Sequence, residues 1–314
     1  MIRSELADWY DRNKRRLPWR ETSDPYAIWI SEIMLQQTRV AAVIPYYERF
    51  LKRFPHVAAL AAAPEEEVLT LWSGLGYYSR ARNLQSAARQ ILDLGSFPQT
   101  YDDLRRLAGI GDYTAAAVAS IAFGLPHAVV DGNVRRVIAR ITNGKGEAQE
   151  IANLLMDRKI PARSNQALME LGAVICLPRD PLCLECPIAK ACEARKHGTQ
   201  NDLPARRPKP ETIHLKRKLL LIHQTDRQTD RILLAPSARV QGFWDLPEPF
   251  KGVRIGPRLG EFRHSITHHI YSFTVYEAAV RIAPKAFRWF DCKDIDEIPL
   301  STTAKKGMRC SIGV

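Results

Sequence analysis

The chain has 314 residues, of which 46% are hydrophobic and 25% charged, and its 46 lysines and arginines against 34 aspartates and glutamates give a formal net charge of +12. This length predicts two domains, and the composition is that of an ordinary globular protein. No run of about 18 consecutive apolar residues occurs, so we expect no transmembrane helix. The first residues are charged and lack the apolar core of a signal peptide, so we expect an intracellular protein. The positive charge favours a polyanionic partner without identifying it.

Residues 1 to about 192 show helical periodicity almost throughout. Asp24-Pro25 predicts a helix start, with Asp as the N-cap and Pro at the first helical position. Glu32 lies in that helix, and its neighbours three and four residues away are Ile28, Trp29, Leu35 and Gln36. Burial on so apolar a face should raise the pKa of this carboxyl group. The alternative is a structural carboxylate bonded to a helix end or to an arginine.

Two glycine-containing stretches follow in the helical region. Leu107–Asn133 opens with the hairpin Leu107-Ala108-Gly109-Ile110-Gly111, continues as an alanine-rich helix, and ends with Asp131 at the start of another helix. The free N–H groups of the first helix suit a phosphate. Residues 74–82, GLGYYSRAR, place leucine and two tyrosines beside two arginines. On a DNA-binding protein these side chains wedge between bases and hold phosphates, whereas on any other protein they are core aromatics beside a solvated face.

Near the end of the helical region, we expect Ser164 to cap a helix that runs to Ile175 and leads into a cysteine cluster. Its spacing is C-x6-C-x2-C-x5-C, formed by Cys176, Cys183, Cys186 and Cys192. Structural zinc sites usually combine two separated short-spaced pairs, whereas four thiolates in one compact loop favour an iron–sulfur cluster. Zinc remains the alternative.

Beyond the cysteines, residues 193–214 hold three prolines and many charges without an apolar period, which predicts a linker. From Leu215 the chain changes to β-rich runs such as KLLLIH, RILLA, HIYSFTVYEAAVRI and FRWF. We therefore expect residues 215–314 to form a small α+β or mostly-β domain on an antiparallel sheet.

These motifs together resemble the helix-hairpin-helix base-excision DNA glycosylases that carry a 4Fe–4S cluster, and within them the adenine DNA glycosylase (MutY) family. The resemblance rests on the hairpin LAGIG, on Asp131 in VDGNVRR and on the cysteine loop, together with LPWR (17–20), SEIMLQQTRV (31–40), GLGYYSRARNL (74–84) and NQALMELGAVIC (165–176). It is dense over residues 5–195 and thinner beyond.

The resemblance implies a mainly α glycosylase region over 1–195 followed by a small α+β domain. The glycosylase region would comprise a six-helix subdomain at about 20–125 and a cluster subdomain at about 1–19 and 126–195. A linker would cover 196–214, and a truncated Nudix-like domain for recognition of 8-oxoguanine would cover 215–314. QGFWDLPE (241–248) matches that domain, but the acidic helix of nucleotide pyrophosphatases is absent from the sequence, so we expect no such activity.

The implied activity is removal of adenine mispaired with 8-oxoguanine or guanine by hydrolysis of the N-glycosidic bond. Glu32 would be the general acid on N7 of adenine, Asp131 would stabilise the sugar cation, and Asn133 would hydrogen-bond this pair. Related endonuclease III-like enzymes have a Schiff-base lysine where this chain has Tyr113, so we expect base removal without efficient strand cleavage. Otherwise Tyr113 is a packed aromatic.

The same resemblance implies the DNA contacts. The adenine pocket would be lined by Trp19, Arg20, Leu35 and Gln166. The gap around the opposing base would be filled or flanked by Gln37, Thr38, Leu75 and Tyr77, and a phosphate would be held by Gly109 and Gly111. In the family a Phe-Ser-His loop reads 8-oxoguanine, and here it would be Phe262-Arg263-His264, with His268 and His269 nearby on what is otherwise a surface β-turn.

We thus expect a monomeric, cytoplasmic, nucleoid-associated enzyme that binds double-stranded DNA and carries one 4Fe–4S cluster on the four clustered cysteines. An endonuclease III-like lyase and a thymine-mismatch glycosylase are the alternatives within the superfamily. A non-catalytic iron–sulfur binder of damaged DNA is the alternative from another class, although it would have no need of both carboxylates.

Overall fold

The computed structural model describes residues 2–205, 210–225 and 229–310. The described chain divides into two compact units: residues up to 61 with 86–205 form the first, and residues 62–85 with those from 210 onward form the second. Within the described residues, no helix has the length and the apolar character needed to cross a membrane.

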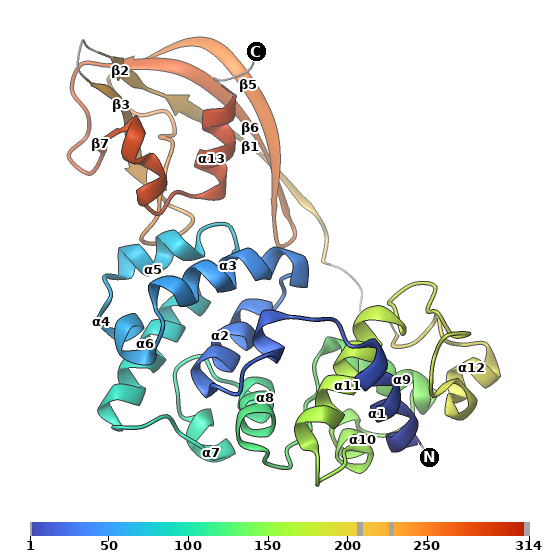
Figure 1. Ribbon diagram of the computed structural model, residues 1–314. Coiled ribbons are helices and arrows are strands. Elements are labelled where there is room, and N and C mark those ends of the chain that lie inside the picture. Colours follow the sequence, from blue (N-terminus) through green and yellow to red (C-terminus); the bar gives the residue numbers. More distant parts are fainter. Residues whose placement is uncertain (1, 206–209, 226–228, 311–314) are drawn as a thin grey trace. The chain divides into compact units, whose positions relative to one another are not determined.

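Helices build the first unit (Figure 1). They are α1 (Ile2–Asn13), α2 (Pro25–Leu35), α3 (Val40–Arg53), α4 (Val57–Ala62), α7 (Tyr101–Arg105), α8 (Asp112–Phe123), α9 (Gly132–Ile141), α10 (Ala148–Leu155), α11 (Pro161–Val174) and α12 (Glu193–His197), with short 3₁₀ turns at Pro18–Arg20 and Ala189–Ala191. Helix α6 (Ser79–Asp93) begins in the second unit and ends in the first, and α5 (Glu65–Trp72) belongs to the second.

Helix α2 is buried on all sides because its sequence is apolar all round. It starts as predicted: the Asp24 carboxylate accepts a hydrogen bond from the Tyr26 N–H at 3.0 Å, and Pro25 occupies the first turn. Its neighbours include α8, whose buried face is mostly alanine and allows a close approach of the two helices. Glu32 therefore lies inside the core of the first unit.

A second part of the core joins the beginning of the chain to its middle. Helix α1 packs against α11, which in turn packs against α9, through side chains such as Leu6, Val137 and Leu171 (Figure 1). Helix α11 begins at Pro161, three residues before the predicted cap. Proline suits the first turn of a helix, and the Ser164 hydroxyl instead accepts a hydrogen bond from the Asp157 N–H at 3.0 Å.

The second unit holds the strands. They are β1 (Ile213–Leu221), β2 (His223–Thr225), β3 (Asp230–Pro236), β4 (Trp244–Asp245), β5 (Val253–Ile266), β6 (His269–Val280) and β7 (Arg288–Asp291), followed by a 3₁₀ helix (Cys292–Glu297) and α13 (Thr302–Arg309).

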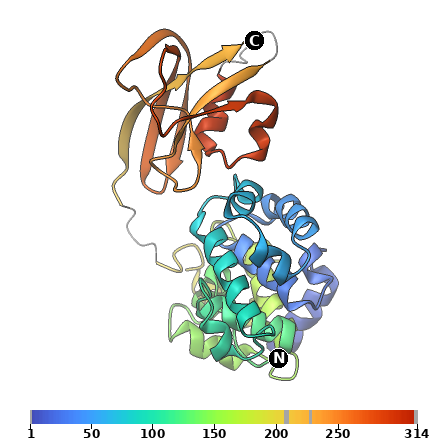
Figure 2. The same cartoon turned by 90° about the vertical axis from the view of Figure 1, so that its left-hand side faces the viewer.

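These strands form two sheets. One has the order β1-β6-β5, with β1 parallel and β5 antiparallel to β6; in the other, β3 pairs with β2, β4 and β7. Helix α13 lies against the first sheet (Figures 1 and 2), and Leu219, Phe273 and Leu300 belong to the core of this unit. The predicted fold class, a mainly helical region followed by a small α+β domain, is confirmed.

Candidate active site

A pocket of about 150 Å³ in the first unit gathers side chains from distant parts of the chain. Its lining includes Trp19, Arg20, Glu32, Leu35, Thr38, Tyr113, Asp131, Asn133 and Gln166, all of which the sequence singled out. A wider groove of about 1280 Å³ shares Leu35, Thr38, Tyr113, Asp131 and Asn133 with this pocket. The pocket therefore opens from the groove.

The groove contains the predicted glycine hairpin. Gly109 and Gly111 line it, and so does Gln37. Gly109 has φ +74°, a conformation that glycine adopts without steric cost, and Gly111 is the N-cap of α8. The first N–H groups of α8 thus begin at the groove, where they suit an anion.

Glu32 is 4% exposed and lies at the pocket. Burial raises its pKa from 4.5 to about 7; the nearby Asp131 adds to the rise, while the hydrogen bond from Tyr113 and the charge of Arg20 oppose it. The Tyr113 hydroxyl donates to Glu32 Oε2 at 2.6 Å. At neutral pH a large fraction of Glu32 is therefore protonated and able to act as an acid.

Asp131 is the N-cap of α9. Its Oδ1 accepts a hydrogen bond from the Val134 N–H at 2.7 Å, and its Oδ2 accepts one from Asn133 Nδ2 at 3.0 Å. Burial raises the pKa of Asp131 despite these bonds, which favour the ionised form. A helix start favours an ionised carboxylate, but burial of the carboxyl group outweighs this effect.

Gly172 of α11 makes room for the Asp131–Asn133 turn at the start of α9. A Cβ atom added to Gly172 would lie 2.6 Å from the Cβ atom of Asn133 and 3.1 Å from its backbone. Because the neighbouring atoms include rigid backbone, any larger residue would push the Asp131–Asn133 turn away from α11. Gly172 therefore sets how deeply this turn sits at the pocket.

Sequence reasoning missed a buried ion-pair network beside the pocket. Glu170 has no exposed side-chain surface, and it pairs with Arg15 at 2.7 Å and with Arg20 at 2.8 Å. Burial alone would raise the pKa of Glu170, but hydrogen bonds from the two guanidinium groups outweigh it and hold the pKa at about 2. The signal was available: Glu170, like Glu32, is a carboxylate on an apolar helix face, one turn after Gln166.

The side chain of Gln166 is held by Tyr10 of α1. Its Oε1 accepts a hydrogen bond from the Tyr10 hydroxyl at 2.5 Å, and the Arg20 guanidinium lies 5.6 Å from the centre of the same tyrosine ring. The side-chain amide nitrogen of Gln166 is then the group left to donate a hydrogen bond to a molecule in the pocket.

A separate cavity of about 570 Å³ lies within the second unit and is lined by Leu75, Tyr77 and His264. Leu75 is only 8% exposed, whereas Tyr77 is 51% exposed and has φ +49°. Of these two side chains, Tyr77 is the one that reaches solvent. Burial, together with Lys306 and Arg239, lowers the pKa of His264.

The predicted Phe-x-His loop is wrong as a local structure. Phe262, Arg263 and His264 lie inside β5, and the turn between β5 and β6 falls at Thr267, with φ +53°. The Phe262 ring stacks on Phe273 with 5.1 Å between the ring centres, and it is partly buried against the core of the unit. Phe262 does not line the cavity that His264 lines, and its ring packs against the core instead.

The four clustered cysteines line one small cavity, together with the buried Arg140. The Arg140 guanidinium donates to Cys176 Sγ at 3.3 Å, and the Cys192 thiol donates to the Arg140 carbonyl at 3.4 Å. Among the described residues, no three of these sulfurs lie within 4.8 Å of one another.

Residues 30–161, which lie mostly in the first unit, match the family described as HhH-GPD superfamily base excision DNA repair protein. A solved thermostable thymine-DNA glycosylase is 31% identical with a TM-score of 0.58, covering 62% of this chain and 95% of that one. An endonuclease III–DNA covalent intermediate, 24% identical with a TM-score of 0.56 over 63% of this chain and 95% of that one, shares the fold.

Two curated relatives identify the family within this superfamily. The mouse adenine DNA glycosylase is 32% identical over 398 residues, covering 98% of this chain and 77% of the mouse protein. The human adenine DNA glycosylase is 45% identical over 224 residues, which is 65% of this chain and 41% of the human protein. The chain belongs to the adenine DNA glycosylase family, which confirms the resemblance inferred from the motifs. The match to the human protein spans less than half of that protein's length.

Proposed function

We propose that the protein is a DNA glycosylase that removes adenine mispaired with 8-oxoguanine or guanine. The observation that carries this proposal is the buried Glu32, with a pKa of about 7, in a pocket that also holds Asp131 and opens from a groove. Cleavage of a glycosidic bond requires a carboxyl group that acts as an acid and a second carboxylate that lies in a different environment.

The mechanism follows from these groups. The adenine leaves the base stack and enters the pocket, and Glu32 donates its proton to N7. The electron pair of the glycosidic bond moves onto the base, and Asp131 stabilises the positive charge that forms on the sugar. Water then adds to the sugar carbon and loses a proton to the Glu32 carboxylate, which restores the acid and leaves free adenine and an abasic site. Tyr113 has no amine to form a Schiff base, so the strand stays intact.

Other pocket residues would hold the base in this position. The Trp19 ring offers an apolar face, and the Gln166 amide nitrogen offers a donor for an acceptor nitrogen of adenine. Arg20 is held by Glu170 and so keeps its position at the pocket. The hairpin with Gly109 and Gly111 would bind a backbone phosphate next to the flipped nucleotide.

We further propose that the second unit reads the base opposite adenine through the cavity that Tyr77 and His264 line. The exposed Tyr77 ring is suited to stack on a base or to insert beside it. His264 has a lowered pKa, which favours the neutral imidazole with one donor and one acceptor nitrogen. Phe262 does not line this cavity, since its ring packs against the core.

We propose that Cys176, Cys183, Cys186 and Cys192 hold one 4Fe–4S cluster, a proposal supported by four thiols that line one cavity and by their C-x6-C-x2-C-x5-C spacing. Such a cluster would cross-link the loop after α11 and orient its basic side chains for DNA. Purified protein should then be brown and contain about four iron atoms per chain. Zinc in place of iron would contradict this assignment.

The decisive experiment compares duplexes that carry A opposite 8-oxoguanine, A opposite G, and T opposite G. We expect an abasic site only in the first two, and Glu32→Gln should abolish the reaction while the variant still binds the duplex. Direct nicking of DNA with an oxidised pyrimidine would favour an endonuclease III-like lyase, and release of T from G·T would favour a thymine-mismatch glycosylase. Tight binding without activity on any duplex would favour a non-catalytic binder.

The remaining expectations follow from this substrate. A monomer bound to double-stranded DNA should appear as one chain per duplex in sedimentation or light scattering. An enzyme of genomic DNA belongs in the cytoplasm with the nucleoid, which imaging of the tagged protein would test.

A further inference from the structure

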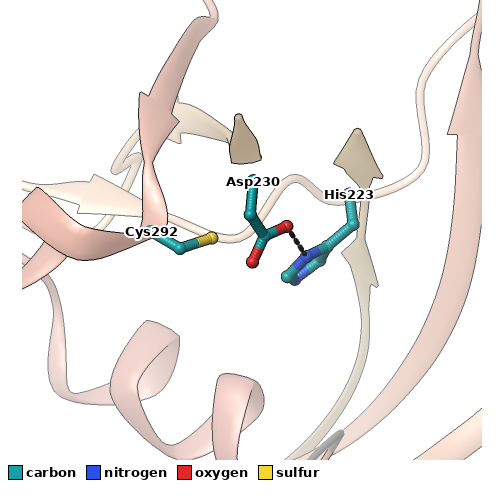
Figure 3. A group of neighbouring side chains, drawn as sticks. All are labelled: His223, Asp230 and Cys292. Atoms are coloured by element: carbon teal, nitrogen blue, oxygen red, sulfur yellow. Dashed lines mark ion pairs between the residues drawn. The ribbon is translucent and has the colours of Figure 1, made fainter. Parts of the chain in front are cut away.

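In the second unit, three side chains of metal-binding type converge outside the cavity described above. They are His223 on β2, Asp230 at the start of β3, and Cys292 directly after β7 (Figure 3). The group is separate in sequence from the four cysteines at 176–192 and from the catalytic pocket, both of which lie in the first unit.

Strand register brings these residues together. Strand β3 pairs with β2 on one side and with β7 on the other, and both pairings are antiparallel. Thr225 lies opposite Asp230, so His223, two residues earlier, shares that face of β2. Arg231 lies opposite Asp291, so Cys292 follows β7 at the position beside Asp230. Asp230 is therefore flanked by a histidine on one side and a cysteine on the other, and the three point toward one another (Figure 3).

The distances suit a single small cation. One ligand atom from each of the three residues lies within 4.8 Å of the other two, and His223 Nδ1 is 3.5 Å from Asp230 Oδ1. Bonds of about 2.0–2.3 Å to nitrogen, oxygen and sulfur place the ligands of tetrahedral zinc roughly 3.3–3.8 Å apart. Small side-chain rotations would therefore close the site without any movement of the strands.

The carboxylate of Asp230 is also held by Thr225, which is not one of the three residues. The Thr225 hydroxyl donates to Asp230 Oδ1 at 3.0 Å, which fixes the orientation of the carboxylate as supporting groups do around metal ligands. The half-exposed side chains of His223 and Asp230, 41% and 53%, give an ion a path from solvent and leave room for water as a fourth ligand.

We propose that His223, Asp230 and Cys292 form a zinc site that joins the β2–β3 hairpin to the end of β7. A set of one nitrogen, one oxygen and one sulfur ligand suits Zn²⁺, whereas Ca²⁺ and Mg²⁺ prefer oxygen ligands alone. The ion ties together strands that are distant in sequence and so stabilises the second unit. Binding displaces the thiol proton of Cys292, because the ligand is the thiolate.

The test measures zinc in the full-length protein with its own iron content intact. Chelator-washed protein is titrated with Zn²⁺ against a chromophoric chelator, and iron is measured in parallel. We expect the wild-type protein to bind one more equivalent of Zn²⁺ than the His223→Ala or Cys292→Ser variant does. If a variant still binds this equivalent, its affinity for Zn²⁺ should be at least about 10-fold weaker than that of the wild type. Thr225→Val should weaken binding by about 10-fold, because it removes only the support of the carboxylate.

Cys310→Ser is the matched control, because Cys310 is another partly buried cysteine of the same unit that packs against Gly260. It should bind zinc as wild type does, and it should keep the thiolate-to-metal absorption band of the Co²⁺-loaded protein that Cys292→Ser loses. Circular dichroism and iron content confirm that each variant is folded. Equal zinc binding by wild type, His223→Ala and Cys292→Ser would overturn the proposal, as would loss of the cobalt band in Cys310→Ser alone.

Discussion

Glu32→Gln should change the pH dependence of stability in a way that reports the protonation of this residue. The substitution replaces a buried carboxyl group by a neutral amide of the same shape and removes its titration. In the wild-type protein, burial raises the pKa of Glu32 from 4.5 to about 7. The folded protein therefore holds this proton more tightly than the unfolded chain does.

The sign and size of the effect follow from this difference. Below about pH 4.5 the carboxyl group is protonated in both states, and its contribution to stability is fully present. As the pH rises toward 7, only the unfolded chain ionises freely, so the wild-type protein loses stability. Each pKa unit is worth about 1.4 kcal/mol, which makes the total loss about 3 kcal/mol. The variant lacks this loss and should gain about 3 kcal/mol relative to wild type over the same range.

The assay is urea unfolding followed by circular dichroism between about pH 5 and about pH 8. The quantity compared is how the difference in free energy of unfolding between the two proteins changes with pH. Any cost of the new amide that is the same at every pH cancels in this comparison. Glu48→Gln, the same change on the exposed face of α3, is the control and should leave the pH dependence unchanged, because that side chain stays in water. Parallel pH curves for wild type and Glu32→Gln would refute the conclusion that Glu32 is protonated at neutral pH.

Three further variants test the surrounding groups. Tyr113→Phe removes a hydrogen bond that lowers the pKa of Glu32, so the alkaline limb of single-turnover base release should move to higher pH; an unmoved limb would contradict that role. Asp131→Asn keeps an N-cap but removes the charge, so α9 should stay folded while the rate falls by about 10²-fold or more; a near-normal rate would exclude Asp131 from catalysis. Glu170→Gln leaves Arg20 unpaired in a buried site and should cost about 3 kcal/mol in urea unfolding, whereas an unchanged midpoint would show that the network carries little stability.

Much of the fold could be predicted because its signals are local. Asp24-Pro25 marks the start of α2 by cap geometry, and an apolar helix sequence is enough to bury Glu32. Asp131 caps α9 as expected, since the capping bond joins residues three apart. Even here, burial changed the outcome: it raises the pKa of Asp131, and no local pattern reports how deep a helix start lies.

The errors came from segments in which packing decides between local alternatives. Phe262-Arg263-His264 is compatible with a loop, but pairing with β6 makes it part of a strand, and the Phe262 ring packs against the core. Ser164 is a good cap in isolation, yet α11 begins three residues earlier at Pro161. In both cases the local sequence favours neither conformation strongly, so contacts with residues distant in the sequence decide which conformation forms.

By itself, the sequence determined the family, the buried acid on α2, the carboxylate that caps α9, the glycine hairpin and the four-cysteine loop, because each depends on neighbours within a few turns of the chain. Only the tertiary structure decided which distant groups meet. Glu170 reaches Arg15 across 155 positions, Gly172 sets the depth of Asn133, and His223, Asp230 and Cys292 converge through strand register. The physical reason is that helix packing and register minimise exposed apolar surface over the whole chain, which no local pattern encodes.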